Sequence, residues 1–253
     1  MKLAQRTILI TGGTSGIGFE LAKQLLHLGN TVIVTGRERK RLDEAKQSLT
    51  GLITIQSDVG DPVAIRQLYE QVLAEFPGLD TLINNAGIMR NMRLDQDRDL
   101  VDLTREIQIN LCGPLRMVQQ FLPHLKTREN GLIVNVSSGL AFVPLPVAPV
   151  YSATKAAMHS YTQSLRVQLE GSAVTVIELA PPGVDTPLFR GEFAEETKGM
   201  KAMDVKVLVK HAIRGIEAGN SEIRPGQSNF LKLMSRIAPE FMLKQLGKTM
   251  KTK

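Results

Sequence analysis

Residues 7–18, which read TILITGGTSGIG, contain the motif that decides the fold of this chain. Five strand-forming residues run directly into a glycine-rich loop, and the loop opens a segment with helical spacing. Glycines at this junction allow a tight turn and let a phosphate group approach the free N–H groups of the helix N-terminus. A tight turn with surplus glycines is the alternative, but the flanking strand and helix favour binding. The candidate phosphate-binding residues are Gly12, Thr14, Ser15, Gly16, Ile17 and Gly18.

Strand-like and helix-like segments alternate along the rest of the chain. The apolar, β-branched runs are continuous, as in strands that are buried on both faces of a sheet. Between them, apolar residues recur with helical spacing over residues 17–28 and 63–76, and these segments end at Gly29 and Pro77. This order implies an α/β fold with a parallel sheet and right-handed crossovers. The expected strands are residues 7–11, 31–35, 53–55, 82–83, 132–136 and 174–177.

The composition excludes several classes of protein. With 253 residues, 43% hydrophobic and 22% charged, the chain has the balance of one large globular domain. The single cysteine, Cys112, excludes an internal disulfide or a cysteine-cluster metal site and favours a reducing compartment. The four histidines lack ligand spacing, so we expect no metal. No apolar run approaches the roughly 18 residues of a spanning helix, and we expect a cytoplasmic protein.

The residue after the second expected strand indicates which dinucleotide would bind. An acidic side chain there would bind the ribose hydroxyls of NAD, whereas this chain has Arg37. A guanidinium suits a 2′-phosphate, so we expect NADP(H) in preference to NAD(H). The alternative for this charged stretch is a solvated helix start, which describes Arg39 and Lys40 better than Arg37.

Two further loops follow strands and therefore lie at the carboxyl edge of the sheet, where ligands bind in open α/β sheets. Asp58 and Val59 follow the third strand, and Asn84 begins the sequence NNAG after the fourth. Asparagine is also a common turn former, so this loop alone is a weak indication. The additional candidate cofactor-binding residues are Asp58, Val59, Asn85, Ala86 and Gly87.

Tyr151 and Lys155 form the candidate chemical centre. Four residues apart at the start of an expected helix over 151–170, they share one helix face. An ammonium beside a phenol favours the phenolate, so we expect a lowered pKa for Tyr151. Such a phenol can exchange a proton with a carbonyl or alcohol oxygen while hydride moves on carbon. Ser138, which ends the fifth strand, would bind the same oxygen, whereas Ser137 would bond locally.

These motifs, in this order and spacing, resemble those of the short-chain dehydrogenase/reductase family. The glycine loop matches the family's Thr-Gly-x-x-x-Gly-x-Gly, residues 84–87 match Asn-Asn-Ala-Gly, and residues 151–155 match Tyr-x-x-x-Lys, with Ser138 at the expected distance. The resemblance covers about residues 5–225. It implies that Asn110 lies at a helix kink holding a proton-relay water, and that Lys155 also binds the nicotinamide ribose. The implied catalytic residues are Asn110, Ser138, Tyr151 and Lys155.

The same resemblance implies a Rossmann-like doubly wound sandwich with a seven-stranded parallel sheet, an NAD(P) cofactor, and a homodimer or homotetramer. It assigns Val184 and Thr186 to the nicotinamide carboxamide. Pro182 departs from the family pattern, which has glycine there, and its fixed φ changes the local path. With this variant, the chain resembles the bacterial subgroup of oxidoreductases similar to the one associated with D-alanine-transfer operons.

The apolar loop 139–150, stiffened by three prolines, is expected to line the pocket and to favour a small apolar carbonyl or alcohol substrate. Packing of this loop on a neighbouring subunit or on a lid is the alternative. Residues 186–203 break the strand and helix rhythm with mixed polar residues, and we interpret them as a lid near the site. We therefore expect residues 1–229 to form a single NAD(P)-binding domain.

Residues 230–253 form a basic tail, in which six basic residues against Glu240 carry +5 of the net charge of +6. Apolar positions with helical spacing, interrupted near Pro239, predict an amphipathic helix. We expect it to pack on the domain or across a dimer, with contact to an anionic membrane as the alternative. Nucleic acid is not expected, because the chain has no Trp, three Tyr and none of the usual motifs.

The sequence as a whole predicts an NADPH-dependent oxidoreductase that transfers hydride reversibly between nicotinamide and a carbonyl or secondary alcohol. Tyr151 would be its general acid/base. A non-catalytic NADP-binding sensor or scaffold is the rival interpretation, against which the presence of both Tyr151 and Lys155 argues.

Overall fold

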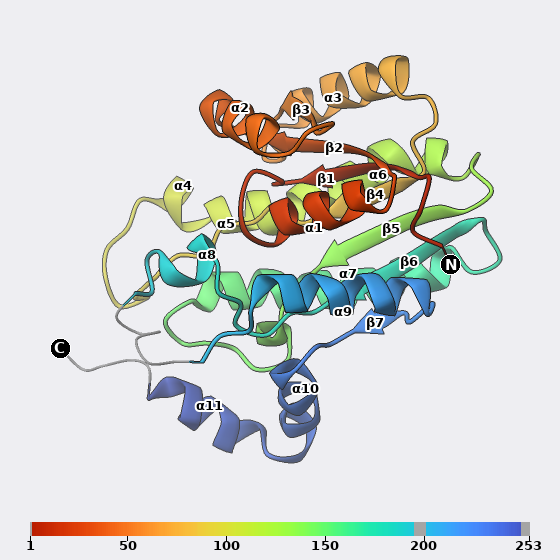
Figure 1. Ribbon diagram of the computed structural model, residues 1–253. Helices are drawn as coiled ribbons and strands as arrows, with labels where there is room; N and C mark the ends of the chain where they lie inside the picture. The colour runs from red at the N-terminus through yellow and green to blue at the C-terminus, as the bar shows by residue number, and fades with distance from the viewer. Residues whose placement is uncertain (1, 195–200, 249–253) are drawn as a thin grey trace.

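A seven-stranded, entirely parallel sheet forms the centre of the protein, as the computed structural model describes it for residues 2–194 and 201–248 (Figure 1). The strand order is β3-β2-β1-β4-β5-β6-β7. A crossover from β3 to β4 therefore passes β2 and β1, which creates a switch point between β1 and β4. The strands are β1 (Thr7–Thr11), β2 (Thr31–Gly36), β3 (Ile53–Gln56), β4 (Thr81–Asn84), β5 (Gly131–Val136), β6 (Val174–Leu179) and β7 (Glu222–Ile223).

Helices cover both faces of this sheet, which confirms the doubly wound sandwich. Ile8 and Ile10 of β1 belong to one apolar cluster and Leu9 to the other, because side chains alternate along a strand. Each such buried side chain stabilises the fold by about 1.5–3 kcal/mol. The first face carries α1 (Gly16–His27), α2 (Arg39–Ser48) and α9 (Val205–Glu217); the second carries α3 (Pro62–Glu75), α6 (Gly113–Leu125) and α7 (Pro149–Gln168).

The apolar runs of the sequence predicted six of the seven strands to within about two residues. The seventh, β7, has only two residues and leaves no run to detect, so only the family resemblance implied it. Helix α7 begins at Pro149 rather than at Tyr151, because proline is tolerated in the first helical turn, where no N–H is needed.

Short helical turns gather beyond the carboxyl ends of the strands, where α4, α5 and α8 lie together in Figure 1. These turns are less regular than the covering helices, and all of them except η2 contribute residues to the cavity described below. They are α4 (Leu100–Leu103), α5 (Arg105–Ile107), the π-helical turn η1 (Gln108–Cys112), the 3-10 turn η2 (Gly139–Ala141) and α8 (Pro187–Arg190).

Two helices follow β7 and extend past the edge of the sheet, α10 (Gln227–Ile237) and α11 (Pro239–Gly247) (Figure 1). The first packs on the domain, with its Lys232 ammonium 2.5 Å from a Glu222 carboxylate oxygen. Side chains on the outer surface, such as Phe230 and Ile237, are exposed. Part of the expected lid and the end of the expected tail, 195–200 and 249–253, lie outside the described residues.

None of the helices in the described part of the chain combines the length and the hydropathy that crossing a membrane would require.

Candidate active site

A cavity of about 680 Å³ opens at the carboxyl edge of the sheet. Loops that follow β1, β2, β3 and β4 form its walls, together with the end of β5 and parts of α7 and α8. Fourteen of the residues singled out from the sequence line it, although they come from distant parts of the chain. They are Gly12, Thr14, Ser15, Gly16, Ile17, Arg37, Asp58, Val59, Asn85, Ala86, Gly87, Tyr151, Lys155 and Thr186.

The glycine loop has the backbone geometry that its sequence predicts. Gly12 has a φ of +67° and Gly16 a φ of +56°, in the left-handed region that favours glycine. A Cβ atom on Gly12 would lie 2.7 Å from Ala86 Cα, so the loop and the wall of the cavity touch closely. No side chain caps the N-terminus of α1, which leaves its first N–H groups available to an anion.

Gly18 does not line the cavity, although it belongs to the same motif. It is buried, and a Cβ atom there would lie 2.3 Å from the Gly12 carbonyl oxygen and 2.5 Å from Asn85 Nδ2. Its role is therefore to let α1 approach the loop, rather than to contact a ligand. Asn85 links the same parts: its Nδ2 donates to the carbonyl oxygens of Thr11 at 3.0 Å and Gly12 at 2.9 Å.

Arg37 lies at the end of β2, exposed at the rim of the cavity. Its guanidinium pairs with no carboxylate among the described residues, so it is available to a ligand. Glu38 also lines the cavity, but its carboxylate lies 3.0 Å from Arg41 Nε. Asp58, on the opposite loop, accepts the Gly60 N–H at 2.8 Å and so shapes the turn after β3.

Asn110 lies in the π-helical turn η1, where the family resemblance implied a helix kink. Its Nδ2 donates to the Ile88 carbonyl at 2.8 Å, its Oδ1 accepts the Ile88 N–H at 2.8 Å, and Nδ2 also lies 3.3 Å from Thr154 Oγ1. A Cβ atom on Gly87 would lie 3.3 Å from Asn110 Oδ1. Asn110 thus fixes the loop after β4 and is itself buried, away from the cavity surface.

Tyr151 and Lys155 line the inner end of the cavity, and Ser138 lies next to Tyr151 without lining the cavity itself. The Ser138 hydroxyl forms a hydrogen bond with the Tyr151 side chain and also accepts the Leu140 N–H at 3.1 Å. Lys155 Nζ donates to the Val136 carbonyl at 2.9 Å and lies 5.5 Å from the centroid of the Tyr151 ring. All three residues are buried.

Burial, rather than the neighbouring ammonium, controls the acidity of these groups. Desolvation raises the pKa of Tyr151 to about 12, although the hydrogen bond with Ser138 lowers it. The same effect lowers the pKa of Lys155 to about 8, which the negative charge of Glu178 partly opposes. The lowered Tyr151 pKa expected from the Tyr-x-x-x-Lys spacing is thus wrong for the protein without ligand.

The sequence suggested that Ser137 would bond locally, and this expectation is wrong. Its hydroxyl donates to a carboxylate oxygen of Glu178, which lies on the neighbouring strand β6. Sequence reasoning passed over Glu178 because an acidic residue inside a strand gives no motif. The only sign was a charged residue in an otherwise apolar run, where burial requires a partner.

Glu106 is a second buried carboxyl that no motif marks. Its Oε1 accepts the Arg90 N–H at 2.9 Å, whereas its Oε2 has no hydrogen-bond partner within the described structure. Desolvation raises the pKa of Glu106 to about 7. Its charge acts on Tyr151 and raises the pKa of the phenol further. Arg90 and Asp102, which pair with each other, line the cavity beside it.

The apolar loop 139–150 lies elsewhere than expected, since none of its residues lines the described cavity. Val147 and Ala148 instead pack in a buried cluster with Met89 and with Phe193 of the expected lid. This arrangement corresponds to the alternative interpretation, in which the loop packs on a lid. Its apolar side chains are used for packing, because their burial removes them from water.

Of the two proposed carboxamide contacts in the segment after β6, Thr186 lines the cavity and Val184 does not. Val184 is buried and pairs with Met203 in an isolated bridge. Thr186 lines the cavity and caps α8, with its hydroxyl 3.4 Å from the Phe189 nitrogen. The Cγ atom of Pro182 lies 3.8 Å from the position that a Cβ atom on Gly226 would occupy, so the proline ring faces the start of α10.

Comparison with known proteins agrees with this fold and these motifs. The sequence profile of the short chain dehydrogenase family matches residues 6–197. The uncharacterized oxidoreductase DltE of Bacillus subtilis is 41% identical over 248 residues, which are 98% of each chain. The NADP-dependent 3-hydroxy acid dehydrogenase YdfG of Escherichia coli is 34% identical over 175 residues, 69% of this chain and 71% of that protein.

Among solved structures, the closed form of serine dehydrogenase complexed with NADP+ is similar, with a TM-score of 0.78 and 28% identity. It covers 86% of this chain and 93% of that chain. The match to DltE also confirms the subgroup that the sequence indicated. With the glycine loop, the NNAG segment and the Tyr-x-x-x-Lys pair around one cavity, this chain belongs to the short-chain dehydrogenase family of oxidoreductases.

Proposed function

We propose that this protein is an NADPH-dependent carbonyl reductase, reversible as an alcohol dehydrogenase, in which Tyr151 is the general acid/base. The observation that supports this most is the buried Tyr151 side chain, which lines the same cavity as the glycine loop and forms a hydrogen bond with Ser138. The acid and the phosphate cradle thus face one space, and the Ser138 hydroxyl lies next to the acid.

The residues of the cavity fit a dinucleotide. The loop at Gly12 and Gly16 would hold the pyrophosphate, because its positive φ angles and the uncapped N-terminus of α1 form a cradle for an anion. Arg37 would bind the 2′-phosphate, and the loop of residues 85–87 and Thr186 would hold the nicotinamide end. When bound, the cofactor supplies or accepts the hydride.

The proton is handled by the chain itself. Because the pKa of Tyr151 is about 12, the phenol is protonated at neutral pH and can donate its proton to a carbonyl oxygen. Ser138 would hold the same oxygen through its hydroxyl as negative charge develops. Lys155, anchored to Val136, supplies the positive charge that would stabilise the phenolate left on Tyr151.

Preference for NADPH is supported by the position of Arg37 and by two similar proteins. The relative YdfG is named NADP-dependent, and the similar serine dehydrogenase was solved with NADP+. In this chain, the acidic neighbour Glu38 is paired with Arg41, whereas Arg37, exposed at the same rim, pairs with no carboxylate among the described residues. A guanidinium recognises a phosphate through charge-assisted hydrogen bonds.

We propose a small carbonyl or secondary alcohol as substrate. Ile88, Met89 and Leu188 give the cavity an apolar wall, and Arg90, Asp102 and Arg105 give it a polar one. The substrate is therefore expected to carry both an apolar and a polar part beside its reacting carbon. A homodimer or homotetramer, usual in the family, is part of the same proposal.

The decisive experiment replaces Tyr151 by Phe and measures NADPH oxidation with a panel of aldehydes, ketones and quinones. Turnover should fall by at least about a thousandfold while NADPH binding, followed by cofactor fluorescence, is retained. Retained turnover would contradict the acid/base role. A wild-type protein that binds NADPH but reduces no carbonyl would favour the sensor interpretation instead.

A further inference from the structure

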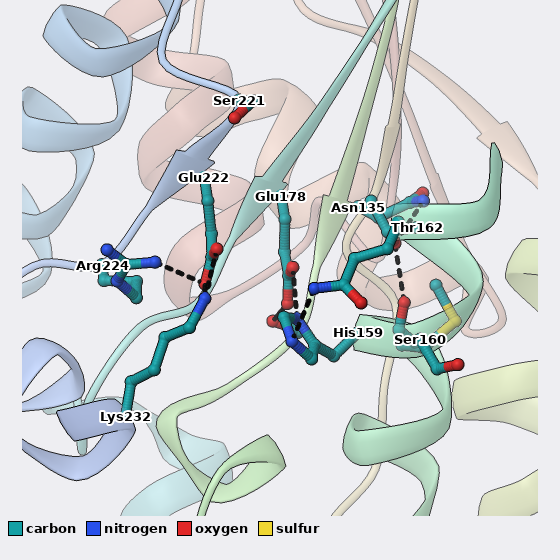
Figure 2. Close-up of polar contacts among 12 residues, drawn as sticks. Asn135, His159, Ser160, Thr162, Glu178, Ser221, Glu222, Arg224 and Lys232 are labelled. Carbon is teal, nitrogen blue, oxygen red and sulfur yellow. Dashed lines mark hydrogen bonds and ion pairs between the residues drawn. The ribbon is translucent and has the colours of Figure 1, made fainter. Parts of the chain in front are cut away.

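An acidic cluster lies between β6, β7, α7 and α10 (Figure 2). Glu178 and Glu222 are paired across the two parallel strands, so their side chains lie on the same face of the sheet. His159 reaches toward Glu178 from α7, and Lys232 reaches toward Glu222 from α10 (Figure 2). Glu178 is completely buried. Removing this carboxylate from water costs free energy, which its contacts must offset.

Protein donors satisfy both carboxylates. Glu178 accepts the Ser137 hydroxyl at one oxygen, and its other oxygen lies 2.7 Å from His159 Nδ1. Glu222 lies 2.5 Å from Lys232 Nζ and 2.7 Å from Arg224 Nη1. Ligand atoms of His159, Glu178 and Glu222 fall within 4.8 Å of one another, but a metal ion there would have to displace these donors. The cluster is therefore better explained by its effect on its neighbours.

Two routes connect Glu178 to the proposed catalytic residues. The first is mechanical: Ser137, which Glu178 binds, lies between Val136, whose carbonyl anchors Lys155, and Ser138. The second is electrostatic: the negative charge of Glu178 raises the pKa of Lys155 against the lowering effect of burial. Glu178 touches neither the cavity nor Tyr151 directly, so it acts through these neighbours.

We propose that Glu178 is a positioning residue for the reaction. Through Ser137 it fixes the turn that carries the Val136 carbonyl and the Ser138 hydroxyl, and its negative charge keeps the buried Lys155 in its ammonium form. This inference rests on the proposed function for its kinetic consequences, but its electrostatic part concerns the chain alone.

Polar and charged groups face Glu178 from every element packed against it. Ser137 faces it from the end of β5, His159 and Lys155 from α7, and Glu222, with its partners Lys232 and Arg224, from β7 and α10. Glu222 carries a like charge, but its two cations neutralise that charge.

His159 completes the site on the solvent side. Its Nε2 lies 3.1 Å from the Gln163 amide nitrogen. Its ring packs edge-on against the Phe142 ring, with the two ring centroids 5.0 Å apart. The ring therefore connects the Gln163 side chain to the Glu178 carboxylate. The carboxylate thus receives hydrogen bonds from two protein side chains.

The test compares Glu178→Gln with Glu222→Gln, two isosteric changes at paired positions of neighbouring strands. Glu178→Gln should lower kcat about tenfold, leave KM for NADPH within about twofold, and move the alkaline limb of the pH profile about one unit lower. The sign follows because an ammonium without its nearby negative charge loses its proton more readily. Glu222→Gln should leave the alkaline limb unchanged.

Two further variants separate the routes and guard against misfolding. Ser137→Ala removes the hydrogen bond but leaves the charge, so kcat should fall while the alkaline limb stays in place. Glu178→Asp keeps the charge on a shorter side chain and should restore the alkaline limb but not the full kcat. If Glu178→Gln does not fold, as judged by circular dichroism, these two variants still carry the test.

A measurement without turnover distinguishes failure of this inference from failure of the proposed function. NMR titration of lysine side chains in the cofactor-free protein, assigned with Lys155→Met, reports the Lys155 pKa directly. It should fall by about one unit in Glu178→Gln and not in Glu222→Gln. Equal values in wild type and Glu178→Gln, or equal effects of both glutamine variants, would overturn the proposal even if carbonyl reduction is demonstrated.

Discussion

Asn110 binds both backbone polar groups of Ile88, donating to its carbonyl oxygen at 2.8 Å and accepting its N–H at 2.8 Å. One side chain thereby replaces the partner strand that Ile88 lacks beyond the end of β4. Because Gly87 packs directly against the same amide, the loop that lines the cavity beside Tyr151 takes its shape from a residue on η1.

Asn110→Ala should therefore destabilise the protein and weaken activity together. Two partly buried backbone groups would lose their partners, at a cost of about 2–4 kcal/mol in the free energy of unfolding. We expect kcat/KM to fall at least about tenfold, because the loop at Gly87 is no longer fixed. Urea denaturation and steady-state kinetics measure both effects. Asn130→Ala, at an exposed asparagine, is the control and should stay within about 0.5 kcal/mol of wild type.

Gly18→Ala should weaken NADPH binding even though Gly18 does not line the cavity. Alanine usually stabilises a helix relative to glycine by about 1 kcal/mol, but here its Cβ would lie 2.3 Å from the Gly12 carbonyl oxygen. We expect a Kd for NADPH at least about tenfold higher, measured by fluorescence titration. Gly247→Ala is the matched helical control, since nothing lies within 4 Å of its Cβ position. Equal affinity in both variants would refute the packing role of Gly18.

Arg37→Ala should change the choice of cofactor. Loss of a charge-assisted contact to the 2′-phosphate should lower kcat/KM for NADPH about tenfold to a hundredfold and leave the value for NADH nearly unchanged. The control is Arg39→Ala, which removes an exposed cation two positions along the chain from Arg37. Arg39 pairs with Asp43. If both variants lose NADPH activity equally, general positive charge rather than Arg37 recognises the phosphate.

Stability should fall as pH rises from 5.5 to 8, because Glu106 is a buried carboxyl. Its pKa is about 7 in the folded protein against an ordinary value of 4.5, so the folded state holds more protons in this window and loses its advantage as Glu106 ionises. The expected loss is about 2 kcal/mol in the free energy of unfolding. Urea denaturation at the two pH values measures it. In Glu106→Gln this loss should largely disappear, and a persistent loss would assign it to another group.

The alternation of strands and helices was readable from sequence because each element carries its own signal. The run over residues 7–11 has an apolar centre, Ile8 to Ile10, between two β-branched threonines, and it pairs on both sides in the sheet. By contrast, β7 has two residues, and only the pairing of Glu222 with Glu178 and of Ile223 with Leu179 makes it a strand. Strand order is likewise absent from any local pattern, since it depends on contacts between segments far apart in the chain.

Within the site, sequence alone determined which groups take part in the candidate chemistry: the glycine loop, whose φ angles require glycine, and Tyr151 with Lys155, whose spacing puts them on one helix face. Tertiary structure alone decided how acidic those groups are and what fixes them. Desolvation raises the pKa of Tyr151 against the expected direction, and Glu178 meets Ser137 across 41 positions of sequence. The reason is physical: burial and charge are set by what surrounds a side chain in space, and a linear motif records only its neighbours along the chain.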